Sequence, residues 1–231
     1  MRTEIIYVGH FADLNDSKTI FGPHSHRLNL PGIYQQFIEG LYQTTLLEYI
    51  AVIFGIASVI FSRMENLLVY PVGMVNTSIY IYLYLTHGLY ADASVNFYYT
   101  VMSIIGWSMW AKKNGGHTAL MITKSSKGDW KKTFIFFGAC FLVLWLILKN
   151  FTDSTVPLAD AFTSAAAFTG MWLMNKKKIE NWIWWIITNL ASIPLNFYKH
   201  LVFTSFQYLV FLILAVMGYI TWKKKLPLAQ A

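Results

Sequence analysis

Charged residues are scarce in this chain of 231 residues, in which Lys, Arg, Asp and Glu together make up 13%. A soluble domain carries about twice that share, roughly 25%. Hydrophobic residues make up 56% of the chain, more than a soluble domain of this length normally contains. The composition excludes a soluble globular protein and predicts an integral membrane protein.

Cysteine is nearly absent, since Cys140 stands alone, so no disulfide framework can form. The chain also lacks a Gly-x-Ser-x-Gly sequence, a His-Glu-x-x-His sequence and a pair of carboxylates in the middle of an apolar run, which are signatures of hydrolases. We therefore expect no enzyme, no cofactor and no metal site. The histidines lie in predicted loops or at the ends of apolar runs, at His10, His24, His26, His87, His117 and His200.

Basic residues are absent from the interior of every long apolar run, and the acids Glu48, Asp92 and Asp160 lie near run ends. A phosphate buried in a membrane site needs basic partners or several helix N-termini, so we do not expect a phosphorylated nucleotide as substrate. The last run has no lysine that could form a Schiff base with retinal. A proton-coupled pump normally places an acid or a histidine at membrane depth, so we expect no proton or sodium coupling.

Long apolar runs fill most of the chain. Each is close to the ~20 residues that cross a ~30 Å hydrocarbon layer as a helix, and runs such as 134–148 lack the alternation of a membrane β-strand. We predict an all-α integral membrane protein with seven transmembrane helices, at residues 46–62, 67–86, 91–111, 133–149, 156–174, 182–198 and 203–222.

The net charge of +7 is unevenly distributed over the predicted loops. Thirteen of the 18 Lys and Arg residues fall on one side, at positions 63, 112–132, 176–178 and 223–225. The positive-inside rule places this side in the cytoplasm, so a multi-pass protein of the cytoplasmic (inner) membrane with its C-terminus inside and its N-terminus outside is predicted. Topology thus explains the charge, and no nucleic-acid partner is expected.

Residues 1–45 precede the first apolar run and are expected to form an extramembrane lead. Residues 1–32 lack a basic start followed by a short apolar core, so no cleaved signal peptide is predicted. From Ile33 onward, apolar residues such as Phe37 share one helical face and polar residues such as Glu39 share the other. This pattern predicts an interfacial amphipathic helix, and an extension of the first span beyond the bilayer fits it equally well.

Short sequences recur about halfway along the chain. Glu65-Asn66 recurs as Glu180-Asn181 at an offset of 115, and Gly106-Trp107 recurs as Gly218-Tyr219 at an offset of 112. A three-residue deletion in one short loop reconciles the two offsets. The recurrence predicts two repeats of three helices each.

The predicted organisation is a three-helix repeat at 46–112, a loop and connector helix at 113–150, a second repeat at 151–225 and a tail at 226–231. A three-helix unit reverses sides, so one connector makes the two repeats parallel. This 3+1+3 order is a SWEET-like transporter architecture, in which the site lies between the repeats. Pro71 and Pro194 fall in the middle helices, which we expect them to bend.

Residues 180–196 combine aromatic rings and carboxamides on one face of a predicted helix. Trp182, Trp185, Asn189 and Asn196 are spaced so that they share that face. Flat indole faces suit a planar ring, and a cationic ring gains an additional ~0.5–2 kcal/mol from them. Trp182 and Trp185 also fit an aromatic belt at the headgroups. We assign such belt positions to Trp107, Trp110, Trp184 and Trp222.

Further polar side chains lie at membrane depth in other runs. Hydrogen bonds between helices, worth ~1 kcal/mol each, would explain any single one of them, but together they exceed what packing requires. We therefore predict a substrate site with no catalytic residue and no metal ligand. Its candidate residues are Trp182, Trp185, Asn189, Asn196, Asn76, Tyr80, Asn96, Gln207 and Tyr208.

Several of these residues belong to sequences that are similar to those of the PnuC-type vitamin transporters. The matching elements, spread over roughly 46–225, are Glu-Asn-Trp-x-x-Trp-x-x-x-Asn at 180–189, Gly73-x-x-Asn76, Leu89-Tyr90-Ala91 and Gly106-Trp107. The resemblance implies a SWEET-like fold of seven helices in a bacterial inner membrane. It also implies facilitated diffusion of nicotinamide riboside (vitamin B3) by alternating access, with cytoplasmic phosphorylation trapping the product.

The expected partners are therefore nicotinamide riboside and the lipid bilayer, and a homo-oligomer is left open. Nicotinamide riboside carries a flat pyridinium, a carboxamide and a ribose without a phosphate, which suits Trp rings and carboxamides. A transporter of another aromatic vitamin or nucleoside, such as thiamine or riboflavin, would need similar residues. A seven-helix ligand receptor is a second class of function that the same features allow.

Overall fold

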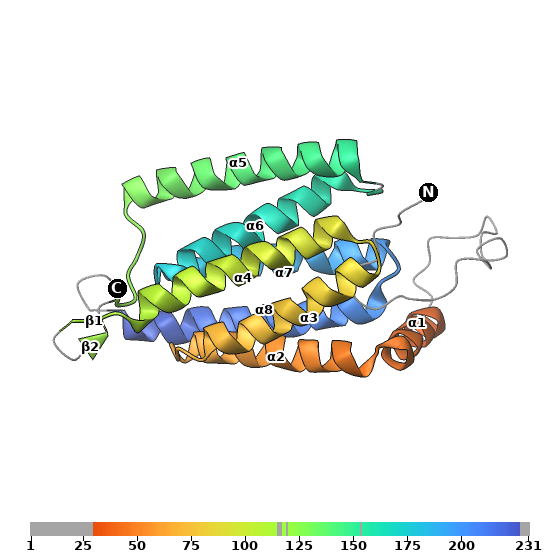
Figure 1. The fold of residues 1–231 in the computed structure, drawn as a ribbon, viewed down its shortest axis with the longest axis horizontal. Coiled ribbons are helices and arrows are strands. Elements are labelled where there is room, and N and C mark those ends of the chain that lie inside the picture. The colour runs from red at the N-terminus through yellow and green to blue at the C-terminus, as the bar shows by residue number, and fades with distance from the viewer. Residues whose placement is uncertain (1–29, 115–116, 119, 153, 227–231) are drawn as a thin grey trace.

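The computed structural model describes residues 30–114, 117–118, 120–152 and 154–226, and helices make up nearly all of them (Figure 1). The residues before 30 and after 226, including most of the predicted lead and tail, lie outside the described part. Eight helices and one short antiparallel hairpin follow in chain order: α1 (Leu30–Gln43), α2 (Leu46–Arg63), α3 (Val69–Thr86), α4 (Tyr90–Ala111), β1 (Lys113–Asn114), β2 (His117–Thr118), α5 (Lys127–Phe151), α6 (Pro157–Asn175), α7 (Asn181–Tyr198) and α8 (Val202–Lys225).

Helices α2 to α8 confirm that each of the seven predicted apolar runs is helical. Six of them begin and end close to the predicted limits. Helix α5 starts six residues earlier, at Lys127 rather than 133. The reason is a capping box, in which the Ser126 hydroxyl accepts from the Asp129 N–H while the Asp129 carboxylate accepts from the Ser126 N–H.

Helix α1 is separate from α2, because Thr45 caps the start of α2 with its side chain. Phe37 of α1 instead packs on α8, with ring centroids 5.6 Å from Phe203 and 4.9 Å from Phe206. Gly40 lies so close to α8 that an added Cβ would come within 2.8 Å of Phe203 Cβ. The predicted amphipathic helix thus exists, but it is not a continuous extension of the first span.

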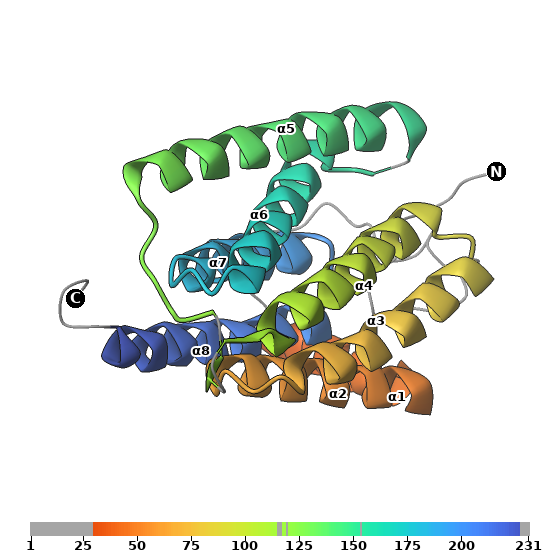
Figure 2. The ribbon, with the colours of Figure 1, turned by 60° about the vertical axis from the view of Figure 1, so that its left-hand side comes forward.

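Two groups of three helices form the bundle. Within the first group α2 packs on α3 and α3 on α4, and within the second α6 packs on α7 and α7 on α8. The groups meet where α4 packs on α6 and where α8 packs on α2. Helix α5 lies at the outer edge beside α6 in both ribbon views (Figures 1 and 2).

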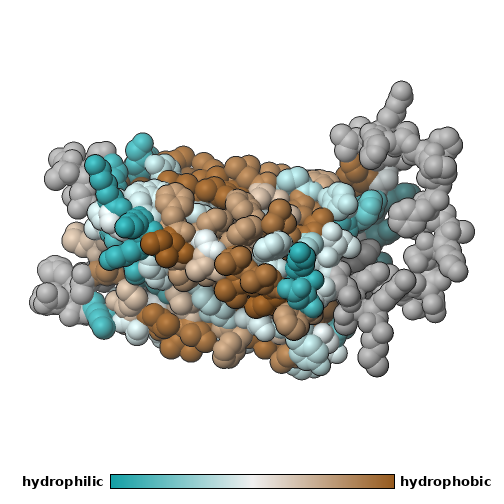
Figure 3. All heavy atoms as spheres, turned by 90° about the horizontal axis from the view of Figure 1, so that it is seen from above, coloured by the Kyte–Doolittle hydropathy of each residue, from teal (hydrophilic) through white to brown (hydrophobic). Residues whose placement is uncertain are grey.

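Three helices in the described part of the chain, α2, α5 and α8, are long and apolar enough to cross a membrane. The same combination of length and hydropathy is not reached by the other four predicted spans, which are α3, α4, α6 and α7. These four carry many of the Asn, Thr, Ser, Tyr and Asp residues that the bundle turns inward. On the face shown in Figure 3, apolar side chains cover much of the middle of the molecule and polar residues gather toward its ends.

The backbone of the first group recurs in the second at an offset of 112. Helix α2 ends in a Schellman motif with Glu65 at φ 59°, and α6 ends in the same motif with Lys177 at φ 50°. The next turns place Gly88 at φ 73° and His200 at φ 61°. The offset of 115 expected from Glu65-Asn66 is therefore wrong, because Glu65 occupies the turn position of Lys177.

The two central prolines do not behave alike. Pro194 lies inside α7, as expected for a bend. Pro71 is the third residue of α3, where the missing N–H would have no intrahelical partner in any case. Pro71 therefore interrupts no hydrogen bond within α3, and the expectation that it bends this helix is wrong.

One end of the bundle carries Arg63, Lys112, Lys176 to Lys178 and Lys223 to Lys225, and is called the lysine-rich end below. An aromatic cluster of Tyr70, Trp110, Trp182 and Trp222 fills its interior. The ring centroids of Tyr70 and Trp110 are 5.3 Å apart, those of Trp110 and Trp222 6.2 Å, and those of Trp182 and Trp222 5.5 Å.

Trp110 and Trp222 are 3% and 0% exposed, so the belt interpretation of these two residues is wrong. Trp110 Nε1 donates to the Asn175 carbonyl over 3.2 Å, and Trp222 Nε1 donates to the Arg63 carbonyl over 3.2 Å. Trp184 is not a belt residue either, because it packs on Phe134 and Phe137 of α5. These indoles sit at the ends of the helices, as the pattern indicated, but they face inward.

Gly106 of α4 lies against Tyr70 of α3, and Gly218 of α8 lies against Trp182 of α7. Neither position has room for a larger residue. A Cβ at Gly106 would overlap the Asn175 and Tyr70 side chains, and one at Gly218 would come within 2.6 Å of the Trp182 ring. Gly106→Ala and Gly218→Ala should each destabilise the protein by about 1–3 kcal/mol through overpacking. Thermal unfolding of the purified protein in detergent measures the loss.

Gly138 provides the matched control. It lies inside α5, and a Cβ there meets nothing within 4 Å, so Gly138→Ala should be neutral or stabilising by up to ~1 kcal/mol. Equal melting temperatures for all three variants would contradict the close helix crossing at Gly106 and Gly218.

Candidate functional site

A cavity of about 320 Å³ lies between the two groups of helices. Its described lining comes from α2, α3 and α4 on one side and from α6, α7 and α8 on the other. Pockets for small ligands usually enclose about 300–1,000 Å³, so the space suits one small molecule. This cavity is the candidate functional site.

Eight of the nine predicted site residues line this cavity. They come from four helices and are Asn76, Tyr80, Asn96, Trp182, Trp185, Asn189, Gln207 and Tyr208. Asn196 does not reach the cavity wall, because its side chain turns back along α7 and donates from Nδ2 to the Ser192 carbonyl over 2.8 Å.

The two tryptophans of α7 have different surroundings near the lysine-rich end. Trp182 is 2% exposed and stands edge-on to Trp222, with an interplanar angle of 89°. Trp185 is partly buried and rests on Gly170, where an added Cβ would lie 3.1 Å from the indole. Trp182 thus belongs to the packing that closes this end, whereas Trp185 presents a ring to the cavity.

Polar groups line the middle of the cavity. Asn76 donates from Nδ2 to the Ala51 carbonyl over 2.7 Å, which holds its side chain between α3 and α2. The hydroxyls of Thr77 and Thr100 are 2.8 Å apart and join α3 to α4. Asn189 is buried opposite them on α7. The wall therefore offers hydroxyl and carboxamide groups that are held in place by backbone or neighbouring hydroxyl contacts.

Two buried polar atoms at the opposite end of the cavity have no hydrogen-bond partner among the described residues: the Tyr80 hydroxyl and Asp92 Oδ2. Trp182 Nε1 is a third such atom, at the lysine-rich end. Buried polar groups are normally paired, and an unpaired one is explained by a function or a bound molecule. All three atoms belong to residues that line the cavity.

None of the described residues lining the cavity is a Lys or an Arg. Two basic residues at the ends of cavity-lining helices have partners outside the cavity. Lys199 Nζ lies 2.6 Å from Asp160 Oδ1, and Arg63 Nε donates to the Thr221 hydroxyl over 3.0 Å. The lining is thus uncharged except for Asp92.

A family profile described as nicotinamide mononucleotide transporter matches residues 45–224, more than half of the chain. The chain belongs to this transporter family. Membership confirms the resemblance found in the sequence and the expectation that the protein is not an enzyme. The family region begins at the cap of α2 and ends within the last turn of α8.

Relatives of known name agree with this assignment. The nicotinamide riboside transporter PnuC of Neisseria mucosa is 25% identical over 189 residues, 77% of this chain and 72% of the relative. Its namesake in Escherichia coli is 20% identical over 210 residues, 79% and 87% of the two chains. The riboflavin/roseoflavin transporter RibM of Streptomyces davaonensis is 27% identical over 66 residues, 29% and 31% of the two chains.

A solved structure shares the fold. The crystal structure of the vitamin B3 transporter PnuC superposes with a TM-score of 0.63 at 22% identity, covering 88% of this chain and 93% of that one. At this identity the likeness speaks for the fold alone, and it confirms the all-helical fold.

Sequence reasoning missed several cavity residues of this family member. Tyr70, Tyr99, Ser103, Met171 and Thr188 line the cavity but were not among the candidates. The repeat offset of 112 would have indicated two of them, because it aligns Tyr70 with Trp182 and Thr188 with Asn76, which were candidates. The offset of 115 obscured these pairs.

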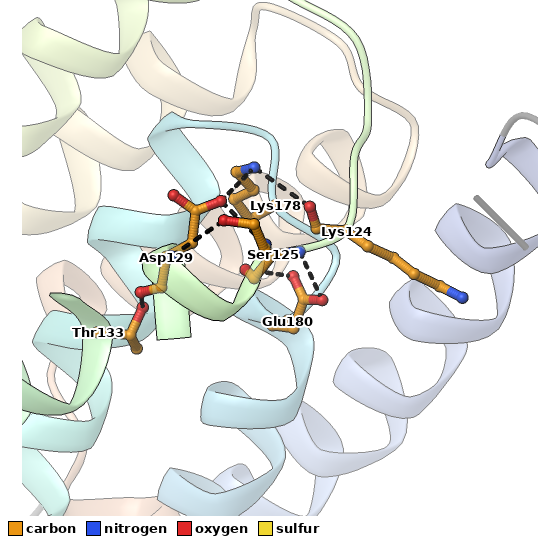
Figure 4. A network of polar contacts seen from close by, with 7 residues as sticks. Lys124, Ser125, Asp129, Thr133, Lys178 and Glu180 are labelled. Atoms are coloured by element: carbon orange, nitrogen blue, oxygen red, sulfur yellow. Dashed lines mark hydrogen bonds and ion pairs between the residues drawn. The ribbon is translucent and has the colours of Figure 1, made fainter. Parts of the chain in front are cut away.

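The glutamate of the Glu-Asn-Trp sequence lies outside the cavity and anchors a loop (Figure 4). The Glu180 carboxylate accepts from the Ser125 N–H over 2.9 Å and from the Ser125 hydroxyl over 2.7 Å. Lys178 Nζ lies 3.0 Å from Asp129 Oδ2 and donates to the Lys124 carbonyl over 3.2 Å. The motif thus ties the segment before α5 to the turn between α6 and α7.

The different surroundings of the two tryptophans predict different mutant behaviour. Trp185→Ala should weaken binding of nicotinamide riboside about 10-fold or more, because stacking a flat ring on an aromatic face contributes ~1–3 kcal/mol. Its melting temperature should stay near that of the wild type. Trp182→Ala should instead lower stability by ~3–5 kcal/mol, the usual cost of deleting a buried indole.

Calorimetric titration and thermal unfolding of both variants separate the two effects. Trp182→Phe serves as the control that keeps an aromatic ring against Trp222. Normal binding by a folded Trp185→Ala variant would place the ligand away from this ring.

Proposed function

We propose that this protein carries nicotinamide riboside across the bacterial cytoplasmic membrane by facilitated diffusion. The observation that carries the proposal is the cavity: its described lining combines the Trp185 ring, carboxamides and hydroxyls with one acid and no basic side chain. Nicotinamide riboside offers a flat cationic ring, a carboxamide and ribose hydroxyls, and it has no phosphate. The names of the Neisseria and Escherichia relatives support the same substrate.

The proposed architecture is seven transmembrane helices in a 3+1+3 order. Helices α2 to α4 form repeat 1, α6 to α8 form repeat 2, and α5 is the connector. The support is the pairing of helices: the third helix of each repeat packs on the first helix of the other, as α4 on α6 and α8 on α2. The two repeats run in parallel about an axis along the membrane normal.

In this topology the lysine-rich end faces the cytoplasm, as the positive-inside rule requires. The N-terminus is then outside and the C-terminus inside. Transport proceeds by alternating access, in which the repeats rock about the central cavity. Opening toward the cytoplasm requires the aromatic cluster and the ion pairs of Glu65 with Lys177 and Lys225, at 3.2 Å and 2.8 Å, to separate. Cytoplasmic phosphorylation of the riboside then traps it.

A transporter of another aromatic vitamin is the second candidate. The observation behind it is the short match to the riboflavin/roseoflavin transporter RibM. Binding of nicotinamide riboside, thiamine and riboflavin to the purified protein, compared by calorimetry, decides between them. A receptor would bind the riboside without moving it, which liposome assays distinguish.

Uptake into liposomes tests the transport proposal. Purified protein in empty liposomes should equilibrate labelled nicotinamide riboside across the membrane and then stop, because none of the described helices carries an acid or a histidine in the middle of a span, where coupling would need one. An imposed pH or sodium gradient should leave the final level unchanged. Protein-free liposomes are the control, and accumulation above equilibrium driven by either gradient would contradict facilitated diffusion.

The phosphorylated form should be a poor ligand, although the family profile carries the mononucleotide in its name. A phosphate entering a cavity lined by Asp92 and no described Lys or Arg loses water without gaining a basic partner. We expect nicotinamide mononucleotide to bind at least ~100-fold more weakly than the riboside, which corresponds to ~2.7 kcal/mol. Similar affinities in one titration series would mean that a basic group reaches the site.

A further inference from the structure

Asp92 is the acid in the described cavity lining, and the proposed transport cycle assigns it no role. It lies in the first turn of α4, is 8% exposed and lines the cavity at the end away from the lysine-rich end. Its Oδ2 atom is buried and has no hydrogen-bond partner among the described residues. A buried carboxylate oxygen without a hydrogen-bond partner is unfavourable unless a nearby group compensates it.

Two other buried acids at this end, Glu48 and Asp160, have partners and do not line the cavity. Glu48 Oε2 accepts from the Thr45 N–H over 2.6 Å and from the Thr45 hydroxyl over 2.8 Å. Asp160 is paired with Lys199 through Oδ1 and accepts from the Ser154 hydroxyl through Oδ2 over 2.7 Å. These two carboxylates are therefore already paired within the protein.

The surroundings of Asp92 direct it toward a ligand. Asn96, one turn further along α4, donates from Nδ2 to the Asp92 backbone carbonyl over 3.0 Å, so that amide is not used by the carboxylate. The Tyr80 hydroxyl, also without a partner among the described residues, lies at the same end of the cavity. No described Lys or Arg lines the wall to neutralise Asp92 from within the cavity.

We propose that Asp92 is the counter-ion for a cationic substrate, so that the cavity selects a positively charged ring over a neutral or anionic one of the same shape. The inference rests on the proposed function and deepens it: the pyridinium of nicotinamide riboside places a positive charge inside the cavity, where the described lining has none. The indole of Trp185 then favours a planar ligand ring, and the Asp92 carboxylate favours a positively charged one. The two requirements are chemically separable.

A pair of ligands that differ in charge but little in shape tests the inference. Reduction of the pyridinium to a dihydropyridine gives a neutral riboside with the same carboxamide and ribose. Wild-type protein should bind the cationic form at least ~10-fold more tightly than the neutral one, a ratio that corresponds to ~1.4 kcal/mol. Asp92→Asn should lose that preference by weakening the cation's affinity while leaving the neutral form's affinity within about 2-fold.

Two further variants make the result specific. Glu48→Gln removes an equal charge at the same end of the bundle but outside the cavity wall, so the preference for the cation should survive. Asn96→Asp in the Asp92→Asn background moves the carboxylate one turn along the same wall and should restore part of the preference. Thermal unfolding in detergent checks that each variant is folded.

Each outcome decides the inference. Equal affinities of wild-type protein for the two forms would overturn it without any variant, as would an Asp92→Asn variant whose affinities for both forms fall by the same factor, so that the preference for the cation is kept. Wild-type protein that binds neither form would contradict the proposed function itself. Loss of cation preference in Asp92→Asn, with its partial return in the double variant, supports Asp92 as the counter-ion.

Discussion

Two indole N–H groups join the halves of this protein at the lysine-rich end. Trp110 of α4 donates to the carbonyl of Asn175, the last residue of α6, and Trp222 of α8 donates to the carbonyl of Arg63, the last residue of α2. Carbonyls at a helix C-terminus have no partner within the helix, and leaving them unpaired in apolar surroundings is costly. Each half therefore donates a hydrogen bond to a C-terminal helix carbonyl of the other half.

This reciprocal contact depends on Gly106 and Gly218, because any side chain there would displace the Tyr70 or Trp182 ring that fills the space beside the indoles. With one end held in this way, the polar faces of the helices turn toward each other rather than toward lipid. The cavity is the consequence. Its walls hold the carboxamides and hydroxyls that would be unfavourable on the outer surface, which is largely apolar (Figure 3).

Charge is divided between two regions of the molecule with different tasks. Lysines gather at one end, where they pair with Glu65, Asp129 and backbone carbonyls and where, in the proposed topology, they orient the chain in the membrane. The described cavity lining contains Asp92 and no basic residue. A ligand inside the bundle would meet a negative charge in a medium that screens it weakly, so the interior is suited to select ligands by charge. The lysine-rich end, in the proposed topology, determines the orientation of the chain in the membrane.

The sequence by itself determined the helical class, the limits of most helices and the family, and eight of the nine side chains that it predicted for a site line the cavity. Helical periodicity and apolar run length suffice for this, because both are local properties of the chain. Tertiary structure decided the rest. Trp110, Trp182 and Trp222 lie near helix ends, as residues of a headgroup belt do, but tertiary packing turned them inward. Trp110 and Trp222 bond to the opposite half, and Trp182 packs on Trp222. Asn196 fits the predicted stripe, yet the bond to the Ser192 carbonyl takes it off the cavity wall. The true offset of 112 became visible through the left-handed turns at Glu65 and Lys177, because equivalent positions in the two halves keep their backbone geometry while their side chains differ.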